Sequence, residues 1–232
     1  MSVPPVGAPR VTRARAAVPT GLVVATLVGF AVVGLLGAGV RSDFGPQLRV
    51  DAAVSEALYA GDDRARALDW LLEALTAPGL SVVRLVVLLP VVVWLAGRRA
   101  WRTVVWVVLS AGLIGPVTTA LKDFFGRVRP AFEGGGARYE SLSFPSGHSS
   151  GIAALVTVAV VLAWPWLTVA ARRAWVGVGA ALVVLVGLTR LWLGVHYLSD
   201  VLGGWALGLS WCLLVALLLD ALPGGRAALP PR

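Results

Sequence analysis

Apolar runs separated by short polar segments recur along the whole chain, and this pattern predicts its architecture. Six of these runs approach the roughly 20 residues that an α-helix needs to cross the hydrocarbon core of a bilayer. The predicted membrane helices are residues 20–40, 80–97, 102–121, 149–169, 174–193 and 199–219. We therefore expect an all-α integral membrane protein, with one six-span domain over 20–221 between a basic tail at 1–19 and a short tail at 222–232.

The first apolar run has an alternative interpretation as a cleaved signal peptide. It is longer than the usual core of about 7–15 residues in such peptides, and no clear small-x-small cleavage site follows it. We therefore predict that residues 20–40 form a permanent span.

The segment 52–77 is not expected to cross the membrane, because charged side chains interrupt it. Four leucines in its second half recur at helical spacing, and they are Leu68, Leu71, Leu72 and Leu75. This spacing predicts an amphipathic helix that lies in the membrane interface. Packing between the first two spans is its simpler role, and lipid gating is the alternative.

Composition supports a membrane protein and excludes other classes. The chain is 58% hydrophobic and 14% charged, whereas soluble domains have about 25% charged residues. The formal net charge of +8 does not indicate a nucleic-acid partner, because the arginines punctuate apolar runs instead of clustering along one face. The single cysteine, Cys212, lies within an apolar run, so no intrachain disulfide or cysteine metal site can form.

Basic residues are concentrated in alternate connecting segments, which predicts the orientation of the chain. These residues are Arg10, Arg13, Arg15, Arg98, Arg99, Arg102, Arg172, Arg173, Arg226 and Arg232. Short loops rich in arginine are retained on the cytoplasmic side, and of the 12 acidic residues only Asp220 falls on that side. We therefore predict a multi-pass protein of the cell membrane with both termini in the cytoplasm.

Polar side chains on the opposite, extracytoplasmic side form three clusters at the ends of spans. In the second cluster, Pro145-Ser146-Gly147-His148 opens the fourth span. Ser146 can cap the helix, the free N–H groups of its first turn can bind an anion, and Gly147 leaves room for a phosphate oxygen to approach the backbone. Ordinary punctuation before a helix is the alternative interpretation of this tetrapeptide.

The third cluster contains His196 and Asp200, spaced i, i+4 where the sixth span begins. A carboxylate bonded to one ring nitrogen fixes the histidine tautomer and leaves the other nitrogen free to attack phosphorus. A satisfied pair at a helix start, or two metal ligands, are the alternatives; no Glu, Cys or third His stands nearby to complete a metal site. Arg190, at the end of the fifth span, needs an anionic partner that a substrate phosphate would supply, and Gly194 can provide the bend between the two spans.

The first cluster contains Lys122 and Arg129, which flank a short turn after the third span. Two cations that snorkel toward the interface are the alternative interpretation. We interpret Arg127 and Asp123 as a solvated or locally paired couple outside the site. Because all three clusters emerge on one side at similar depth, we predict a single anion site in which fixed cations take the place of a metal.

These three clusters resemble the tripartite motif of the type 2 phosphatidic acid phosphatase superfamily, which also includes vanadium haloperoxidases. The matching segments are Lys-x6-Arg-Pro at Lys122 to Pro130, Pro-Ser-Gly-His at 145–148, and Arg-x5-His-x3-Asp at Arg190 to Asp200. The similarity extends in pattern over roughly residues 50–220. Two positions depart from the family pattern, since Thr189 stands where serine is usual and Leu198 where proline is common.

The resemblance implies a phosphohistidine mechanism without cofactor or metal. In this mechanism His196 attacks phosphorus while Asp200 orients it, and His148 protonates the leaving oxygen and then activates water. The residues implied to hold the phosphate oxygens are Lys122, Arg129, Ser146, Gly147 and Arg190.

The function expected from this resemblance is an integral membrane lipid phosphatase that acts on a phosphomonoester or pyrophosphate at the extracytoplasmic face. Undecaprenyl pyrophosphate, phosphatidylglycerophosphate and phosphatidic acid are all suitable substrates. A haloperoxidase is disfavoured because those relatives are soluble. A phosphotransferase that uses an acceptor other than water is the alternative, and a transporter or channel is a remote one, since it would distribute ionisable residues through the depth of the bilayer.

Overall fold

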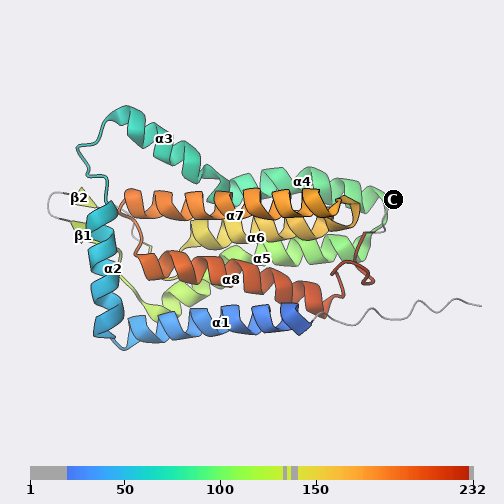
Figure 1. Ribbon diagram of the computed structural model, residues 1–232, viewed down its shortest axis with the longest axis horizontal. Helices are drawn as coiled ribbons and strands as arrows, with labels where there is room; N and C mark the ends of the chain where they lie inside the picture. The colour runs from blue at the N-terminus through green and yellow to red at the C-terminus, as the bar shows by residue number, and fades with distance from the viewer. Residues whose placement is uncertain (1–19, 133–134, 137–140, 230–232) are drawn as a thin grey trace, which may run out of the picture.

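A computed structural model describes residues 20–132, 135–136 and 141–229, and this part of the chain is almost entirely α-helical (Figure 1). Its elements are α1 (Thr20–Arg41), α2 (Gly45–Leu58), α3 (Arg66–Thr76), the 3-10 helix η1 (Ala77–Gly79), α4 (Ser81–Gly97), α5 (Trp101–Phe125), β1 (Ala131–Phe132), β2 (Gly135–Gly136), α6 (Gly147–Ala163), the 3-10 helix η2 (Trp164–Trp166), α7 (Val169–Trp192) and α8 (Leu198–Leu218). The two short strands pair in antiparallel fashion.

Each predicted span coincides with a helix of the bundle, and the predicted ends differ from the observed ones by a few residues. Five described helices are long and apolar enough to cross a membrane. The remaining helix, α4, has 17 residues and reaches this length only together with the segment Arg66–Gly79, from which it is bent by 47°. The all-α membrane fold is therefore confirmed, and the number of six spans stays a prediction.

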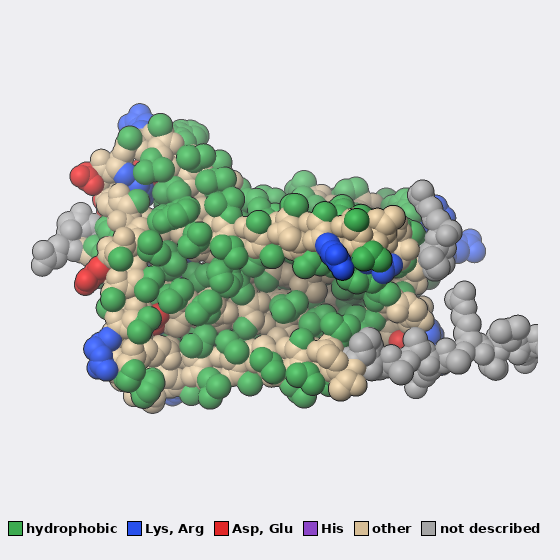
Figure 2. Space-filling model, viewed as in Figure 1, with side chains coloured by type: hydrophobic (Ala, Val, Ile, Leu, Met, Phe, Trp, Pro, Cys, Tyr) green, Lys and Arg blue, Asp and Glu red, His purple; other side chains and the backbone are tan. Residues whose placement is uncertain are grey.

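The outer surface of the bundle is apolar over its middle part. Figure 2 shows hydrophobic side chains across the flanks of the helices, with charged side chains toward the two ends of the molecule. Large side chains that point outward there include Leu27, Leu85, Val93 and Val178, each more than half exposed. Such an exposed apolar band would be costly in water and is favourable in lipid.

Helices α6 and α8 pack unusually closely, and this contact fixes the end of the bundle where both of them begin. A Cβ atom added to Gly204 of α8 would lie 2.6 Å from the carbonyl oxygen of Ser146 and 2.7 Å from Cβ of Ser149. Small residues allow membrane helices to approach each other in this way. The first turn of α6 is therefore held against the first turns of α8.

Helix α2 was not expected from the pattern of the sequence. It crosses the end of the bundle at a steep angle to the other helices (Figure 1). Its buried residues are Asp51 and Ser55, and a buried face made of polar residues gives no apolar periodicity to detect. The prediction of a helix in the second half of 52–77 was right in part, because α3 begins at Arg66, buries Leu72 and exposes Trp70; its position in the membrane interface stays a prediction.

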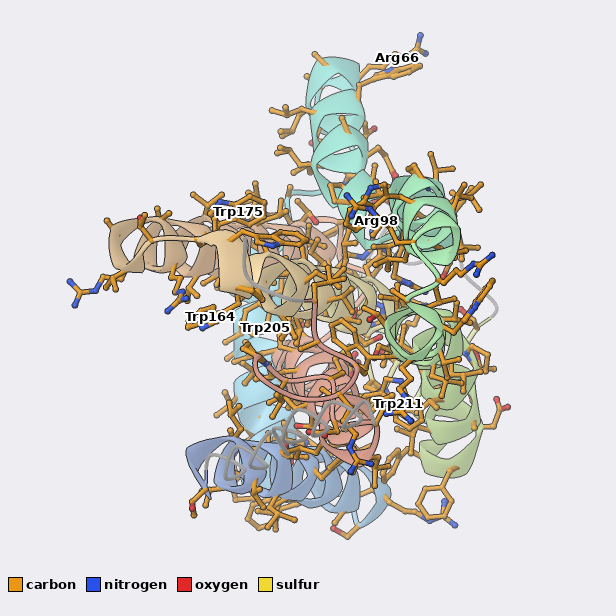
Figure 3. The ribbon with its side chains drawn as sticks, turned by 90° about the vertical axis from the view of Figure 1, so that its right-hand side faces the viewer. Arg66, Arg98, Trp164, Trp175, Trp205 and Trp211 are labelled. Atoms are coloured by element: carbon orange, nitrogen blue, oxygen red, sulfur yellow. The ribbon has the colours of Figure 1, made fainter. Side chains whose placement is uncertain are left out.

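Helix α3 projects from the bundle, and the opposite end of the molecule carries the arginine-rich loops. In the end-on view of Figure 3, α3 stands away from the other helices with Arg66 at its outer end. Arg98 lies at the end that faces the viewer, where its guanidinium carbon is 5.2 Å from the ring centre of Trp94. Four of the arginines that were used to predict the orientation lie outside the described residues, and they are Arg10, Arg13, Arg15 and Arg232. Residues of the C-terminal segment pack back on the bundle, where the hydroxyl of Thr103 donates to the carbonyl oxygen of Ala227 at 2.6 Å.

Candidate active site

The three polar clusters meet at one end of the bundle because of the directions of four helices. Helices α5 and α7 end there, at Phe125 and Trp192, while α6 and α8 begin there, at Gly147 and Leu198. The tight connection between α7 and α8 turns at Gly194, whose φ of +66° suits glycine. A Cβ atom at this position would lie 2.6 Å from the ring of Tyr59, so the predicted role of Gly194 in the bend also includes a close contact with the α2–α3 connection.

His196 and Asp200 form the pair expected from their spacing. Nδ1 of His196 lies 3.3 Å from Oδ2 of Asp200, and both residues are buried. The same carboxylate oxygen accepts the backbone N–H of Tyr197 at 2.9 Å, as part of the cap of α8. A proton on Nδ1 that is donated to Asp200 leaves Nε2 with its lone pair, and Nε2 lies 3.2 Å from Nη1 of Arg129.

The ionisation state of His196 suits a nucleophile. Burial lowers the pKa of His196 to about 3, although the bond to Asp200 acts in the opposite direction. Arg129 and Arg190 lower the pKa further by their positive charge. The imidazole is therefore neutral at physiological pH, and the carboxylate beside it can stabilise positive charge that appears on the ring during attack.

The segment around His148 has the local structure that the sequence predicts. Ser146 is the N-cap of α6, and its hydroxyl accepts the N–H of Ser149 at 3.4 Å. A Cβ atom added to Gly147 would meet nothing closer than Thr118, at 4.0 Å, so packing alone does not require a glycine at this position. His148 lies against Gly79 of η1, where an added Cβ would come within 2.8 Å of Cβ of His148. The need for a glycine at position 79 was not anticipated.

The three predicted phosphate-binding cations gather around the two histidines. Lys122 donates to the carbonyl oxygens of Leu142 and Ser143, and Arg129 donates to that of Val195 at 2.6 Å. Arg190 is almost completely buried. The charges of Arg129 and Arg190 act on both histidines, and that of Lys122 acts on His148. The structure thus brings all eight predicted site residues to one end of the bundle.

The interpretation of Arg127 as solvated or paired with Asp123 was wrong. Arg127 is only 8% exposed, whereas Asp123 is exposed. Nη1 of Arg127 donates to Oδ1 of Asp200 at 2.7 Å, and Nη2 donates to Oδ2 of Asp51 at 2.6 Å. Burial opposes its charge, but the two carboxylates raise the pKa of Arg127 above its ordinary value. Sequence reasoning missed this contact because Asp51 is 76 residues away in a helix that had not been predicted.

Ser143 is a second neighbour of the site that was not anticipated. It is fully buried, and its hydroxyl donates to Oδ2 of Asp200. Its backbone N–H donates to the carbonyl oxygen of Arg127 at 2.7 Å. Ser143 therefore joins the segment before α6 to the same carboxylate that contacts His196. Within the described residues, no group of three His, Cys, Asp or Glu side chains is placed to hold a metal ion.

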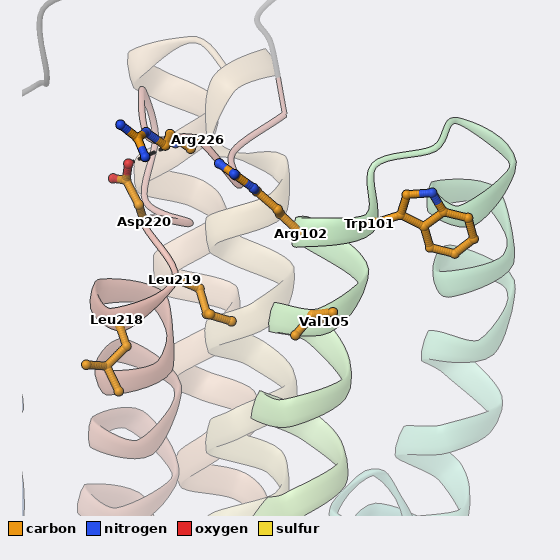
Figure 4. A pocket seen from close by; sticks show the side chains of 7 residues that line it. All are labelled: Trp101, Arg102, Val105, Leu218, Leu219, Asp220 and Arg226. Atoms are coloured by element: carbon orange, nitrogen blue, oxygen red, sulfur yellow. Dashed lines mark hydrogen bonds between the residues drawn. The ribbon is translucent and has the colours of Figure 1, made fainter.

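A hollow of about 390 Å³ lies at the opposite ends of α5 and α8 (Figure 4). Its lining residues are Trp101, Arg102, Val105, Leu218, Leu219, Asp220 and Arg226. The carboxylate of Asp220 accepts the backbone N–H of Arg226 at 3.1 Å. The hollow contains neither histidine nor any other predicted site residue, so the candidate site is the cluster around His148 and His196.

Comparison with known proteins identifies the family of this chain. The sequence profile of the PAP2 superfamily matches residues 100–222, a range that includes all three polar clusters. The chain is 36% identical over 121 residues to phosphatidylglycerophosphatase B of Bacillus subtilis (strain 168), a match that covers 51% of this chain and 58% of that protein's length. It is 28% identical over 160 residues to the putative undecaprenyl-diphosphatase YbjG of Escherichia coli (strain K12), and this match covers 66% of this chain and 76% of YbjG.

Two solved structures are similar to the fold described above. The crystal structure of a transmembrane PAP2 type phosphatidylglycerolphosphate phosphatase from Bacillus subtilis superposes with a TM-score of 0.67 at 29% identity, and the match covers 83% of this chain and 94% of that one. The crystal structure of Aquifex aeolicus LpxE superposes with a TM-score of 0.53 at 23% identity, over 76% of this chain and 97% of that one. The second similarity supports the fold alone.

Proposed function

This chain belongs to the PAP2 superfamily, and we propose that it is an integral membrane lipid phosphatase that works through a phosphohistidine intermediate. The resemblance stated from its motifs is thus confirmed at the level of the family, and the names of its relatives agree with a phosphatase. The observation that carries the proposal is the buried pair of His196 and Asp200, with Nε2 of the neutral imidazole 3.2 Å from Nη1 of Arg129.

The first half of the proposed reaction is attack on phosphorus. Nε2 of His196 forms a bond to phosphorus as the bond to the leaving oxygen breaks, and His148 gives that oxygen a proton. Positive charge on the His196 ring is balanced by Asp200. Charge on the transferring phosphoryl oxygens is met by Lys122, Arg129 and Arg190, where preorganised donors have their largest effect.

The second half of the reaction is hydrolysis of the intermediate. His148, now deprotonated, takes a proton from water, and the resulting oxygen attacks phosphorus and releases His196. The free N–H groups in the first turn of α6, which begins at Gly147, are suited to hold a phosphate oxygen throughout both steps. Ser146 shapes that turn as its cap. No step of this sequence needs a metal ion.

The proposed substrate class is a lipid phosphate or pyrophosphate presented at the extracytoplasmic face. Phosphatidylglycerophosphate and undecaprenyl pyrophosphate are suggested by the names of the relatives, and phosphatidic acid has the same phosphomonoester. Support for the face comes from five arginines at the far end of the bundle, which favour a cytoplasmic position for that end. Two of them lie in the connection after α4 and three near the starts of α5 and α7, and they are Arg98, Arg99, Arg102, Arg172 and Arg173. Both chain termini would then lie in the cytoplasm.

The test is phosphate release by purified protein in detergent from a panel of these three lipids, with His196→Ala as the inactive control. We expect release from at least one lipid by the wild-type protein and none by the variant. Product analysis in the presence of an added alcohol separates hydrolysis from transfer to another acceptor. Equal release by the two proteins would exclude His196 as the nucleophile, and no release by either would argue against the proposed function.

A further inference from the structure

Arg127 joins two buried carboxylates into one unit beside the nucleophile. It lies between Asp51 of α2 and Asp200 of α8, with nitrogen to oxygen distances of 2.6 and 2.7 Å. The side chains of Asp51 and Asp200 are 2% and 0% exposed. A guanidinium is planar and rigid, and here each of its two terminal nitrogens donates to a different carboxylate, so it can hold the two carboxylates in a fixed relative position.

The two oxygens of Asp200 have different partners, and this difference fixes the plane of the carboxylate. Oδ1 accepts from Arg127, whereas Oδ2 accepts from Ser143 and Tyr197 and faces Nδ1 of His196. Without the bond at Oδ1 the carboxylate could rotate more freely about the Cβ–Cγ bond. Arg127 therefore limits the rotation of the group that sets the orientation of the imidazole.

Asp51 is held in its place by the start of α8. Oδ1 of Asp51 accepts the backbone N–H of Ser199 at 2.8 Å, and Oδ2 accepts the hydroxyl of Ser199 at 2.6 Å. Hydroxyl Oγ of Ser199 also accepts from Nη1 of Arg127 at 2.7 Å. Free N–H groups and the positive end of the helix dipole stabilise a carboxylate at this position. Helix α2 thus contributes to the cap of α8, one residue before Asp200.

The charge of this unit bears on the nucleophile. Asp200 and Arg127 alone would be neutral together, and His196 would lose the counter-charge that it needs when its ring becomes positive. The second carboxylate, Asp51, compensates Arg127, so that the unit of three residues keeps one net negative charge on the side of the imidazole that faces Asp200. Without this compensation the buried charge of Arg127 would also destabilise the folded protein.

We infer that Arg127 and Asp51 are positioning residues for the reaction: with Asp200 they form a buried carboxylate–guanidinium–carboxylate unit that orients Asp200 and keeps one net negative charge beside His196. This inference rests on the proposed function of His196 as nucleophile. Asp51 and Arg127 act through Asp200 and are not among the proposed phosphate-binding residues, so their effect is expected in kcat and not in KM.

The experiment compares Asp51→Asn with Glu56→Gln, which removes a charge from an exposed position of the same helix. We expect Asp51→Asn to lower kcat by about 10- to 100-fold, by analogy with the loss found when the partners that orient metal-binding histidines are removed, with KM changed less than about 2-fold. Glu56→Gln should retain wild-type values. Because the chain has only two histidines, ¹⁵N-histidine labelling gives a second measurement: in Asp51→Asn the ring nitrogen signals of His196 should shift, and those of His148 should not.

A double variant protects the test against a folding defect. The double variant Asp51→Asn/Arg127→Gln removes the negative charge of Asp51 and the positive charge of Arg127 together. The negative charge of Asp200 then remains. We expect its kcat to lie above that of Asp51→Asn and below that of Glu56→Gln, because the charge beside His196 is restored and the orientation of Asp200 is not. Arg127→Lys, which keeps the charge but not the paired geometry, should also fall between them.

The outcomes separate this inference from the proposed function. A wild-type kcat in Asp51→Asn, a change confined to KM, or unchanged His196 signals would overturn the inference while the phosphatase activity stands. A second combination of results is a shift of the His196 signals in Asp51→Asn together with no phosphate release from any of the lipids by the wild-type protein. This combination would support the buried unit and overturn the proposed function. If Asp51→Asn does not fold, a double variant with the kcat of Glu56→Gln overturns the inference.

Discussion

The backbone N–H of Ser146 donates to the backbone carbonyl oxygen of Asp200 at 2.9 Å. This bond joins the cap of α6 to the first turn of α8, and so it links the segment that carries His148 to the segment that carries His196. His148 lies in the first turn of α6, and His196 immediately precedes the cap of α8. Their relative position is consequently set by backbone and helix packing, and does not depend on a contact between the imidazoles themselves.

The close packing of these helices predicts a strong effect of one added methyl group. In Gly204→Ala the new Cβ would lie 2.6 Å from the carbonyl oxygen of Ser146, which is backbone and cannot move away alone. We expect a loss of about 1–3 kcal/mol in the free energy of unfolding and a lower kcat, measured by thermal unfolding in detergent and by phosphate release. Gly177→Ala is the matched control, because an added Cβ at Gly177 of α7 meets nothing within 4 Å. Equal melting temperatures for the two variants would contradict the prediction.

The proposed roles of His196 and Asp200 predict unequal losses of activity. His196→Ala removes the attacking nitrogen and should abolish turnover. Asp200→Asn keeps the nitrogen but loses the charge and favours the wrong tautomer, so a reduction in kcat of about 10⁴-fold is expected, as for a tautomer-fixing aspartate in another catalytic triad. Phosphate release by equal amounts of folded protein measures both. Substantial turnover by His196→Ala would remove this residue from the role of nucleophile.

Burial of His196 also predicts how stability depends on pH. The pKa of His196 is lowered to about 3, below the value of about 6.5 for an unfolded histidine. Between these two pKa values the unfolded chain binds a proton that the folded protein does not bind. The contribution of His196 to the free energy of unfolding is therefore complete above a pH of about 6.5 and is lost as the pH falls toward the lowered pKa. The slope cannot exceed about 1.4 kcal/mol per pH unit for one proton.

This dependence is tested by melting temperatures measured in detergent. The pH is varied from 7.5 to 4.5, a range of about three units around the ordinary histidine pKa. We expect the wild-type protein to lose more stability on acidification than His196→Gln, which has no proton to bind at this position. Parallel curves for the two proteins would show that His196 does not carry the effect.

Hydropathy was sufficient to predict the membrane helices because each one presents a long apolar surface. The ends were less well predicted: α5 continues to Phe125, so Lys122 lies inside its last turn and not in the loop. The spacing also predicted that His196 and Asp200 meet, and they do, although not on one helix face: His196 precedes α8, and the contact forms at the cap of that helix. These predictions concern neighbours along the chain, where a few residues of local backbone fix the distance.

The contacts of Arg127 could not be predicted in the same way. Its partners Asp51 and Asp200 are 76 and 73 residues away, and the face of α2 that carries Asp51 is buried although it is polar. In a pattern analysis a charged residue near the end of a span is assigned to solvent. Only the packing of α2 across the start of α8 shows that this arginine is buried between two carboxylates.

The proposed use of fixed cations predicts that activity survives chelation. Lys122, Arg129 and Arg190 supply positive charge to the phosphate, so added EDTA in metal-stripped buffer should leave kcat unchanged. Vanadate, which adopts the trigonal bipyramidal shape of the transferring phosphoryl group, should inhibit. Activity that disappears with EDTA and returns with magnesium or zinc would contradict this prediction.

The proposed orientation decides which pool of lipid the site can reach. A charged headgroup does not easily cross about 30 Å of hydrocarbon, so a site at the outer interface acts on lipids of the outer leaflet.

Cysteine labelling tests this orientation in a Cys212→Ala background, which removes the single buried thiol. A cysteine at Asp63 would report the end that carries the site, because Asp63 is exposed in the α2–α3 connection. A cysteine at Arg98 would report the opposite end, in the exposed connection after α4. A membrane-impermeant thiol reagent applied to intact cells should label the first and not the second, and permeabilised cells provide the control in which both react. The reverse pattern would place the site in the cytoplasm and make lipids of the inner leaflet its substrates.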